Sequence, residues 1–292
     1  MSIFVSLLMM AQASPYGGIG ERPVSQLPPE IIERKEREAQ KRRSQPPATP
    51  AALPAPQTEL DRCLALVNTD PLAALDAAEA WQRQAKGVPA SQAGHCLGVA
   101  LGRLERWSEA EGAFLAAREM AGAGNGLERA RLGAMAGNAA LARGDAEDAL
   151  AALDIAHGDA LAVPDKPLAG DIAIDRARAL VALKRNDEAA AALAEARAVL
   201  PRSAEAWLLS ATLSRRGGKL AEAQAQIEKA AELMPVDPDI GLEAGVIAVL
   251  SGHDEAARKS WQSVVDAAPG SPSAATARGY LAQLGEPGGA KP

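Results

Sequence analysis

The stretch that decides the fold runs from Ala204 to Asp237 and reads AEAWLLSATLSRRGGKLAEAQAQIEKAAELMPVD. Its pattern of small residues, one large apolar residue and a closing proline recurs 34 residues before it and 34 residues after it, and its turn glycine recurs in the later unit. The residues that keep these slots are Ala177, Ala189, Leu193 and Pro201 in the preceding unit, Trp207, Ala211, Gly218, Ala223, Ile227 and Pro235 in this one, and Gly245, Gly252, Ala257, Trp261 and Pro269 in the next. Three units of equal length indicate an internal repeat, which governs every further inference about the fold.

Each slot has a physical reason if one unit is a pair of helices. A small residue such as Ala211 in the first helix lets the second helix cross it closely. Gly218 suits the left-handed backbone that ends a helix, and a large residue such as Ile227 fills the space between units. The proline closes the unit because it cannot continue a helix. The pattern therefore predicts antiparallel helix pairs stacked in a row.

Composition and charge agree with an all-α chain and exclude some partners. Aromatic residues make up only 3% of the sequence, so the core depends on closely packed alanine and leucine rather than on large rings. The segment 1–58 carries seven Lys and Arg against five Asp and Glu, which leaves 24 against 32 for the rest of the chain. An acidic body of this kind argues against nucleic acid as a partner.

These slots resemble the tetratricopeptide repeat, whose signature combines a Trp, a small residue, an Ala, a large apolar residue and a Pro within a unit of fixed length. The unit from Ala204 departs from it at Ser210 and Ser214, where the family has Leu and Tyr. The resemblance is clearest over 170–284 and becomes weaker over 91–163 and 59–88. It implies a right-handed superhelical solenoid of about six helix pairs over 59–284, with residues 272–284 as a C-terminal capping helix. About six extra residues near Pro164 and Pro167 are expected to form a longer surface loop.

The segment 1–58 is expected to lie outside this repeat domain. Ile3 to Ala11 is an apolar run too short to span a bilayer, and Ala11-Gln12-Ala13 fits a signal-peptide cleavage site, although no basic residue precedes the run. We therefore expect a signal peptide over 1–13. Residues 14–58 are rich in proline and charge, which predicts a largely disordered, solvated linker. The alternative for its charged stretch from Pro29 to Arg43 is a short helix that binds a partner. Residues 285–292 are expected to be a disordered tail.

No pattern in the sequence predicts a catalytic, metal or cofactor site. The three histidines, His95, His157 and His253, show no metal-ligand spacing, and we expect them in surface or capping roles. Gly17-Gly18-Ile19-Gly20 follows no strand, so it lacks the context of a phosphate loop. We therefore predict that the chain is not an enzyme and needs no cofactor.

The resemblance implies a binding groove along the concave face, which the family lines mostly with first helices. The residues at the matched positions are Arg131, Asn138, Asp171, Arg178, Leu208, Thr212 and Arg215, with Glu205, Leu242 and Val246 beside them. Arg131, Asn138 and Arg178 would form a polar patch suited to a peptide carboxylate or backbone. The alternative is a generic solvated surface.

The resemblance also offers a role for the two cysteines. Cys63 and Cys96 lie in the first helices of neighbouring units, which pack side by side in this family. A disulfide between them is one interpretation if the protein is exported, and two small buried apolar residues is the other.

The leading functional hypothesis is an exported, periplasmic scaffold that binds a protein or peptide and helps to assemble or position a cell-envelope complex. The alternatives are a cytoplasmic adaptor with the same mode of binding and a self-assembling repeat protein. An enzyme with its site in the groove is the least favoured reading. No transmembrane span is expected.

Overall fold

A computed structural model describes residues 34–38, 40–41 and 58–285. The chain divides into two units, residues 1–55 and residues 56–292. In the first unit, residues 34–38 and 40–41 are helical and exposed, and Arg34 pairs with Glu38 one turn later at 3.6 Å. The signal peptide predicted for 1–13, the tail from 286 and most of the predicted linker lie outside the described residues.

The second unit is a succession of helices. The helices are α2 (Glu59–Val67), α3 (Pro71–Gln84), α4 (Val88–Arg103), α5 (Trp107–Ala121), α6 (Gly126–Arg143), α7 (Ala146–Leu161), α8 (Lys166–Ala182), α9 (Asn186–Val199), α10 (Ala204–Arg216), α11 (Leu220–Leu233), α12 (Pro238–Leu250), α13 (Asp254–Ala267) and α14 (Pro272–Leu284). No strand occurs among residues 58–285. The predicted all-α class is confirmed, and so is the last helix over 272–284.

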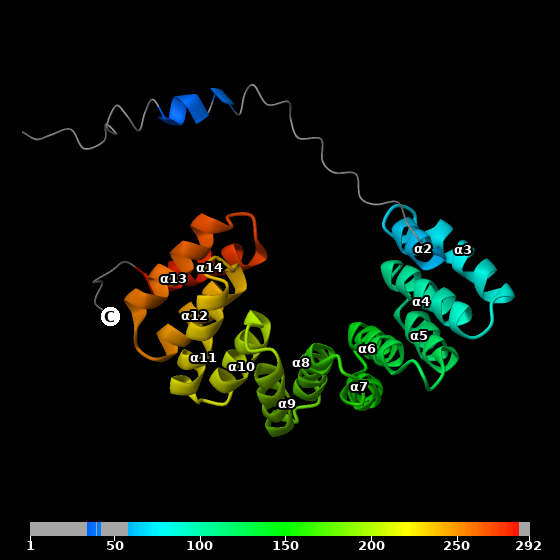
Figure 1. The fold of residues 1–292 in the computed structure, drawn as a ribbon. Helices are drawn as coiled ribbons and strands as arrows, with labels where there is room; N and C mark the ends of the chain where they lie inside the picture. The colour runs from blue at the N-terminus through cyan, green and yellow to red at the C-terminus, as the bar shows by residue number, and fades with distance from the viewer. Residues whose placement is uncertain (1–33, 39, 42–57, 286–292) are drawn as a thin grey trace, which may run out of the picture. The chain divides into compact units, whose positions relative to one another are not determined.

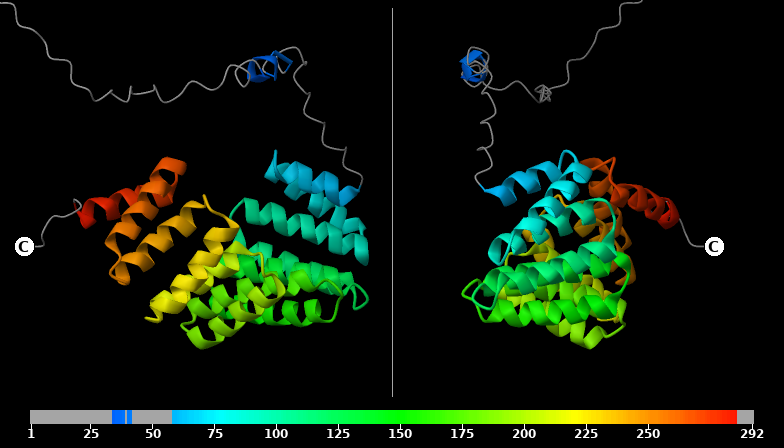
Figure 2. Two further views of the ribbon diagram at one scale, coloured as in Figure 1. Left: turned by 60° about the vertical axis from the view of Figure 1, so that its left-hand side comes forward. Right: turned by 90° about the vertical axis from the view of Figure 1, so that its right-hand side faces the viewer.

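Consecutive helices pack as pairs, and the pairs follow one another along an arc (Figure 1). Even-numbered helices are the first helices of their pairs. On the inside of the bend lie α6 and α8, and on its outside lie α7 and α9. The two further views show the same stacking in chain order, from α2 and α3 at one end to α13 and α14 at the other (Figure 2). This is the solenoid of antiparallel helix pairs that the repeat predicts.

In each helix pair from α4–α5 to α12–α13, one close contact between a small residue and a large one sixteen positions later locks the two helices together. A Cβ atom added to Gly98 would lie 2.5 Å from the ring of Phe114, and one added to Gly245 would lie 2.1 Å from Nε1 of Trp261. Gly137 has the same relation to Leu153. Ala177 with Leu193 and Ala211 with Ile227 take these slots in the remaining pairs and share apolar clusters. The small residues at these positions therefore allow the close crossing of the two helices that the sequence predicts.

The turns inside the pairs from α4–α5 to α12–α13 share one left-handed backbone position. Gly218 and Gly252 hold it with φ of +74° and +79°, as the sequence predicts. Glu105 and Lys184 hold the same position in two other turns, with φ of +58° and +60°. A side chain in this conformation costs about 1–2 kcal/mol. The position in the turn therefore demands the conformation even where glycine is absent.

One prediction about the chain before α8 is wrong. The extra residues near Pro164 do not lengthen a loop, because residues 162–165 connect α7 to α8 just as residues 200–203 connect α9 to α10. The extra residues lengthen the helices instead: α7 and α8 have 16 and 17 residues, whereas α9 and α10 have 14 and 13. Pro167 lies in the first turn of α8, where proline is tolerated and begins a helix rather than a loop.

The contact between Gly245 and Trp261 yields a matched pair of stability predictions. Gly245→Ala places a methyl group against a buried, rigid indole, so we expect a loss of about 1–3 kcal/mol in the free energy of unfolding. Gly279 in α14 has open space around its Cβ position. There, Gly279→Ala should stabilise the helix by about 0.5–1 kcal/mol. Urea unfolding of both variants measures the difference, and equal effects would contradict the packing described.

Candidate functional site

The predicted groove residues lie on the first helices, and polar side chains link these helices across the inner face. The links are Arg131–Asp165 at 3.8 Å, Asn138 Nδ2 to Asp175 at 2.9 Å, Arg178 to Glu205, and Arg215 Nε to Glu243 at 2.6 Å. We call this series the polar ladder, and the face that it follows, on α6, α8, α10 and α12, the groove. The ladder brings together four residues that the resemblance selects and joins each to an acidic side chain on the next first helix or at its N-terminal cap.

The ladder changes the chemistry expected of the groove. Arg178 also pairs with Asp175 on its own helix, so its guanidinium has two carboxylate partners. Arg131 and Asn138 are likewise engaged by acidic residues. A peptide carboxylate would have to displace these partners. The sequence does not mark the acidic partners Asp165, Asp175 and Glu243, because nothing local identifies a carboxylate that pairs with the preceding unit.

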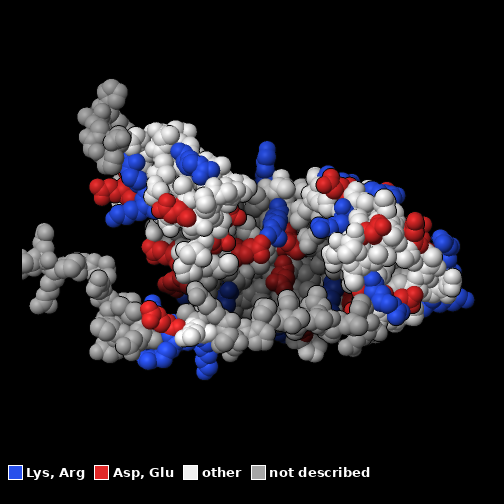
Figure 3. Space-filling model, turned by 90° about the horizontal axis from the view of Figure 1, so that it is seen from above, with Lys and Arg blue, Asp and Glu red and all other residues white. Residues whose placement is uncertain are grey.

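Acidic side chains predominate along part of this face. Seen toward the concave side, red side chains gather in the hollow with fewer blue ones among them (Figure 3). Asp171 is exposed and has no ion pair among the described residues. Partial burial of its carboxyl, followed by the charges of Asp175, Glu205 and Asp165, raises the pKa of Asp171 above its ordinary value. The field at this point of the groove therefore favours a positive group.

The remaining predicted groove residues lie further along the arc. Leu208 is half-buried and packs against the apolar cluster of α10, α11 and α12. Thr212 is half-buried and lines a pocket together with Arg178. Near the C-terminal end, Leu242 and Val246 are only partly buried on α12, and Leu250 is 53% exposed. The groove thus combines an acidic section over α8 with more apolar surface over α10 and α12.

Two of the three histidines are not in the surface or capping role expected of them. His157 Nε2 lies 2.7 Å from Glu195, and His95 Nδ1 lies 3.4 Å from Glu128. Both imidazoles are mostly buried and join one helix pair to the next. Each partner lies more than thirty positions away in sequence, so no local pattern could reveal it. The third, His253, occupies the capping position of α13, as predicted.

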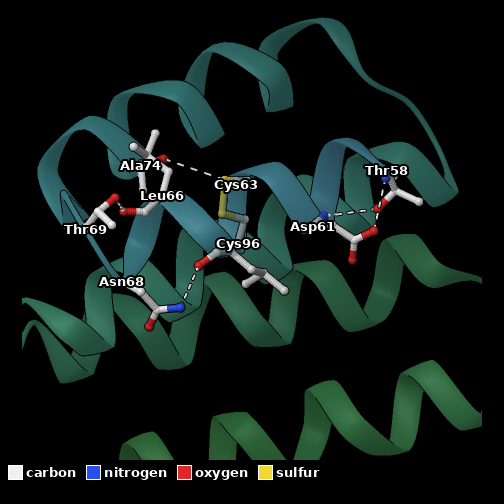
Figure 4. Close-up of a disulfide and its surroundings, with 9 residues drawn as sticks. Thr58, Asp61, Cys63, Leu66, Asn68, Thr69, Ala74 and Cys96 are labelled. Carbon is white, nitrogen blue, oxygen red and sulfur yellow. Dashed lines mark hydrogen bonds between the residues drawn. A yellow bond between two sulfur atoms is a disulfide. The ribbon is translucent and has the colours of Figure 1, made fainter. Parts of the chain in front are cut away.

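Cys63 on α2 and Cys96 on α4 have their sulfur atoms at bonding distance, 1.91 Å apart, with 6.1 Å between the two Cα atoms (Figure 4). Both residues belong to the buried cluster that joins α2 through α7. A reciprocal cap starts α2 nearby: Thr58 Oγ1 accepts from the Asp61 amide, and Asp61 Oδ2 accepts from the Thr58 amide, each at 3.0 Å. A disulfide between residues 33 positions apart contributes about 2–4 kcal/mol to the free energy of unfolding where the compartment is oxidising.

Metal-ligating clusters and membrane-spanning helices do not occur in the described part of the chain. Within residues 34–38, 40–41 and 58–285, no group of three or more His, Cys, Asp or Glu side chains is arranged to hold a metal ion. Over the same ranges, no helix combines the length and the apolar character that crossing a membrane requires.

Known proteins resemble this chain in fold. No family model and no curated protein sequence matches it. PilW, a widely conserved type IV pilus biogenesis factor, superposes with a TM-score of 0.60 at 19% identity and covers 74% of this chain and 97% of its own. The pilF protein of Pseudomonas aeruginosa superposes with a TM-score of 0.60 at 14% identity, and the match covers 76% of this chain and 95% of pilF. A thermophilic TPR protein of Thermus thermophilus superposes with a TM-score of 0.52 at 20% identity, and the match covers 66% of this chain and 98% of that protein. At these identities the likeness concerns the fold alone.

The raised pKa of Asp171 predicts a pH-dependent effect of Asp171→Asn. Because the folded state binds this proton more tightly than the unfolded state, the wild-type carboxylate reduces stability as the pH rises through the raised folded pKa. Asp171→Asn should therefore stabilise the fold at neutral pH by up to about 0.5 kcal/mol, as expected for a surface position, and have no such effect at pH 3.

Urea unfolding at both pH values measures this difference. Glu147→Gln, which removes an exposed carboxylate from the second helix α7, serves as the control and should change little at either pH. A stabilisation by Asp171→Asn that is the same at pH 3 and pH 7 would contradict the electrostatic account.

Proposed function

Because this chain is a tetratricopeptide-repeat protein by its fold, we propose that it is a non-enzymatic scaffold that binds a protein or peptide partner along the groove. The observation that carries the proposal is the polar ladder with its neighbours. One side of four successive first helices presents charged and apolar groups, and the helix pairs that stack along the arc align this side into one continuous face. A surface of this kind suits an extended or helical segment of another protein.

We further propose that the scaffold is exported and assists the assembly or positioning of a cell-envelope complex. Three observations support this proposal: the apolar run Ile3 to Ala11, the small-residue pattern at Ala11 and Ala13, and the paired cysteines. The likeness in fold to PilW, whose own role is type IV pilus biogenesis, agrees with an envelope role.

A cytoplasmic adaptor with the same groove is the alternative for localisation. The two readings differ in the mass of the protein purified from its producing cells. Export predicts cleavage after Ala13 and a disulfide between the cysteines, so that an alkylating reagent added without reductant modifies neither Cys63 nor Cys96. Retention in the cytoplasm predicts an uncleaved chain with both Cys63 and Cys96 alkylated. Intact-mass spectrometry distinguishes these outcomes in one experiment.

The scaffold proposal is tested by capture of a partner in living cells. We expect crosslinking and pull-down of the full chain to recover a partner protein, and Asp171→Lys to reduce its recovery at least severalfold. Asp171 is suited to this test because it is exposed and lies outside the ion pairs of the ladder, so reversing its charge leaves the fold in place.

The matched control is Glu147→Lys, which makes the same charge change on the second helix α7. Equal loss with both variants would indicate a nonspecific charge effect. Recovery of nothing but further copies of this chain would favour self-assembly over the scaffold.

A further inference from the structure

The first helices do not pack evenly along the groove. Direct packing joins α6 to α8, α10 to α12, and α12 to α14. By contrast, α8 and α10 are held together mainly through α9, which packs against both. The inner face is therefore open between α8 and α10, and this opening lies within the section that carries the polar ladder.

A pocket fills this opening, and its walls are almost entirely apolar. Ala177 and Val181 from α8, Leu193 from α9, and Leu209 and Leu213 from α10 form its walls and floor. Leu193 is 2% exposed and is the large residue that locks the α8–α9 pair, so the floor is fixed by the core of the repeat. Arg178, Thr212 and Arg216 form the polar part of the lining. We call this site the α8–α10 pocket.

The two guanidinium groups of the lining differ in what they can still bind. Arg178 is engaged by Asp175 and Glu205. Arg216 is exposed at the end of α10, and within the described part of the chain it has no ion pair. A guanidinium presents a planar fork of donors that matches a carboxylate. Arg216 thus offers a cation beside an apolar cavity.

The opposite charge lies on the other side of the same pocket. Asp171 precedes Ala177 by six positions on α8, which places it about 9 Å toward the start of that helix. Arg216 lies at the end of α10. Since first helices of a solenoid run in the same direction, the unpaired carboxylate and the free guanidinium flank the α8–α10 pocket on opposite sides. An extended chain covers about 9 Å in about three residues.

We propose that the α8–α10 pocket recognises an extended partner segment in which an aliphatic side chain enters the pocket, an adjacent acidic residue binds Arg216, and a basic residue about three positions away on the other side faces Asp171. This assignment rests on the proposed scaffold function and specifies the chemistry of its partner. The apolar walls provide burial for the aliphatic group, and the two flanking charges determine which end of the motif lies toward Asp171 and which lies toward Arg216.

A library of random dodecapeptides displayed on phage tests the proposal with the full chain as bait. We expect the wild-type chain to enrich peptides in which an acidic residue is adjacent to an aliphatic one and a basic residue lies about three positions away on its other side, in either chain direction. Arg216→Glu should keep the aliphatic residue but replace the acidic preference with a basic one. Lys259→Glu, the same charge change at an exposed position of α13, should enrich the wild-type pattern.

A synthetic peptide of the enriched sequence then gives the magnitude. In fluorescence anisotropy, Arg216→Glu should weaken its binding by at least about tenfold, because it removes one charge-assisted hydrogen bond and places a carboxylate against the acidic residue of the peptide. Thermal unfolding of Arg216→Glu should match the wild type, because the side chain is exposed and unpaired.

Three results would overturn the pocket assignment: enrichment of peptides without this arrangement, an acidic preference that survives Arg216→Glu, or the absence of any enrichment. In each case the scaffold function would still be supported if cells yield a partner whose capture depends on Asp171. The two proposals can therefore be contradicted independently.

Discussion

In the pairs from α4–α5 to α12–α13, a small residue facing a large one sixteen positions later determines how closely the two helices approach. Gly245 against Trp261, Gly98 against Phe114 and Gly137 against Leu153 show this most clearly, since none of these glycines has room for a methyl group. Burial of the large side chain contributes about 1.5–3 kcal/mol per pair, and the small residue is the condition for that burial. The left-handed turn position supports the same geometry by reversing the chain within a short turn.

This local contact leads to function through the arrangement of the pairs. Each pair cannot bury its apolar face alone and must stack on its neighbours, which produces a continuous row of first helices on one side. The polar ladder uses that row, because successive first helices come close enough for Asn138 to reach Asp175 and for Arg215 to reach Glu243. Where the row opens between α8 and α10, the apolar interior becomes accessible as a pocket beside Arg216. Packing and recognition therefore depend on the same spacing.

Much of the fold can be predicted from the sequence because its determinants lie within one repeat. The slots of Ala211, Gly218 and Pro235 are local, and so are the start and end of α14 at Pro272 and Leu284. The extra residues before α8 were misassigned because a proline signals a loop as readily as the first turn of a helix. Their place in α7 and α8 depends on packing against neighbouring pairs.

The candidate site was less accessible to sequence reasoning. The resemblance selects groove positions such as Arg131 and Arg178, but it does not reveal that carboxylates from the next unit engage them. Asp175 forms its contacts with residues on two helices, and Glu195 meets His157 of an earlier helix pair. Such pairings depend on the rotation of each helix about its own axis. The opening between α8 and α10 likewise depends on how these helices are placed against α9, and no single residue in either helix predicts it.

The most direct test of this account is site-specific photo-crosslinking in living cells. A photoreactive amino acid at Thr212 would stand on the concave side at the α8–α10 pocket, and one at Ala225 would stand at an exposed position of the second helix α11. The account predicts that a partner protein is covalently captured from Thr212 and not from Ala225. Capture from Ala225 alone, or equally from both positions, would contradict the claim that the groove of first helices is the binding surface.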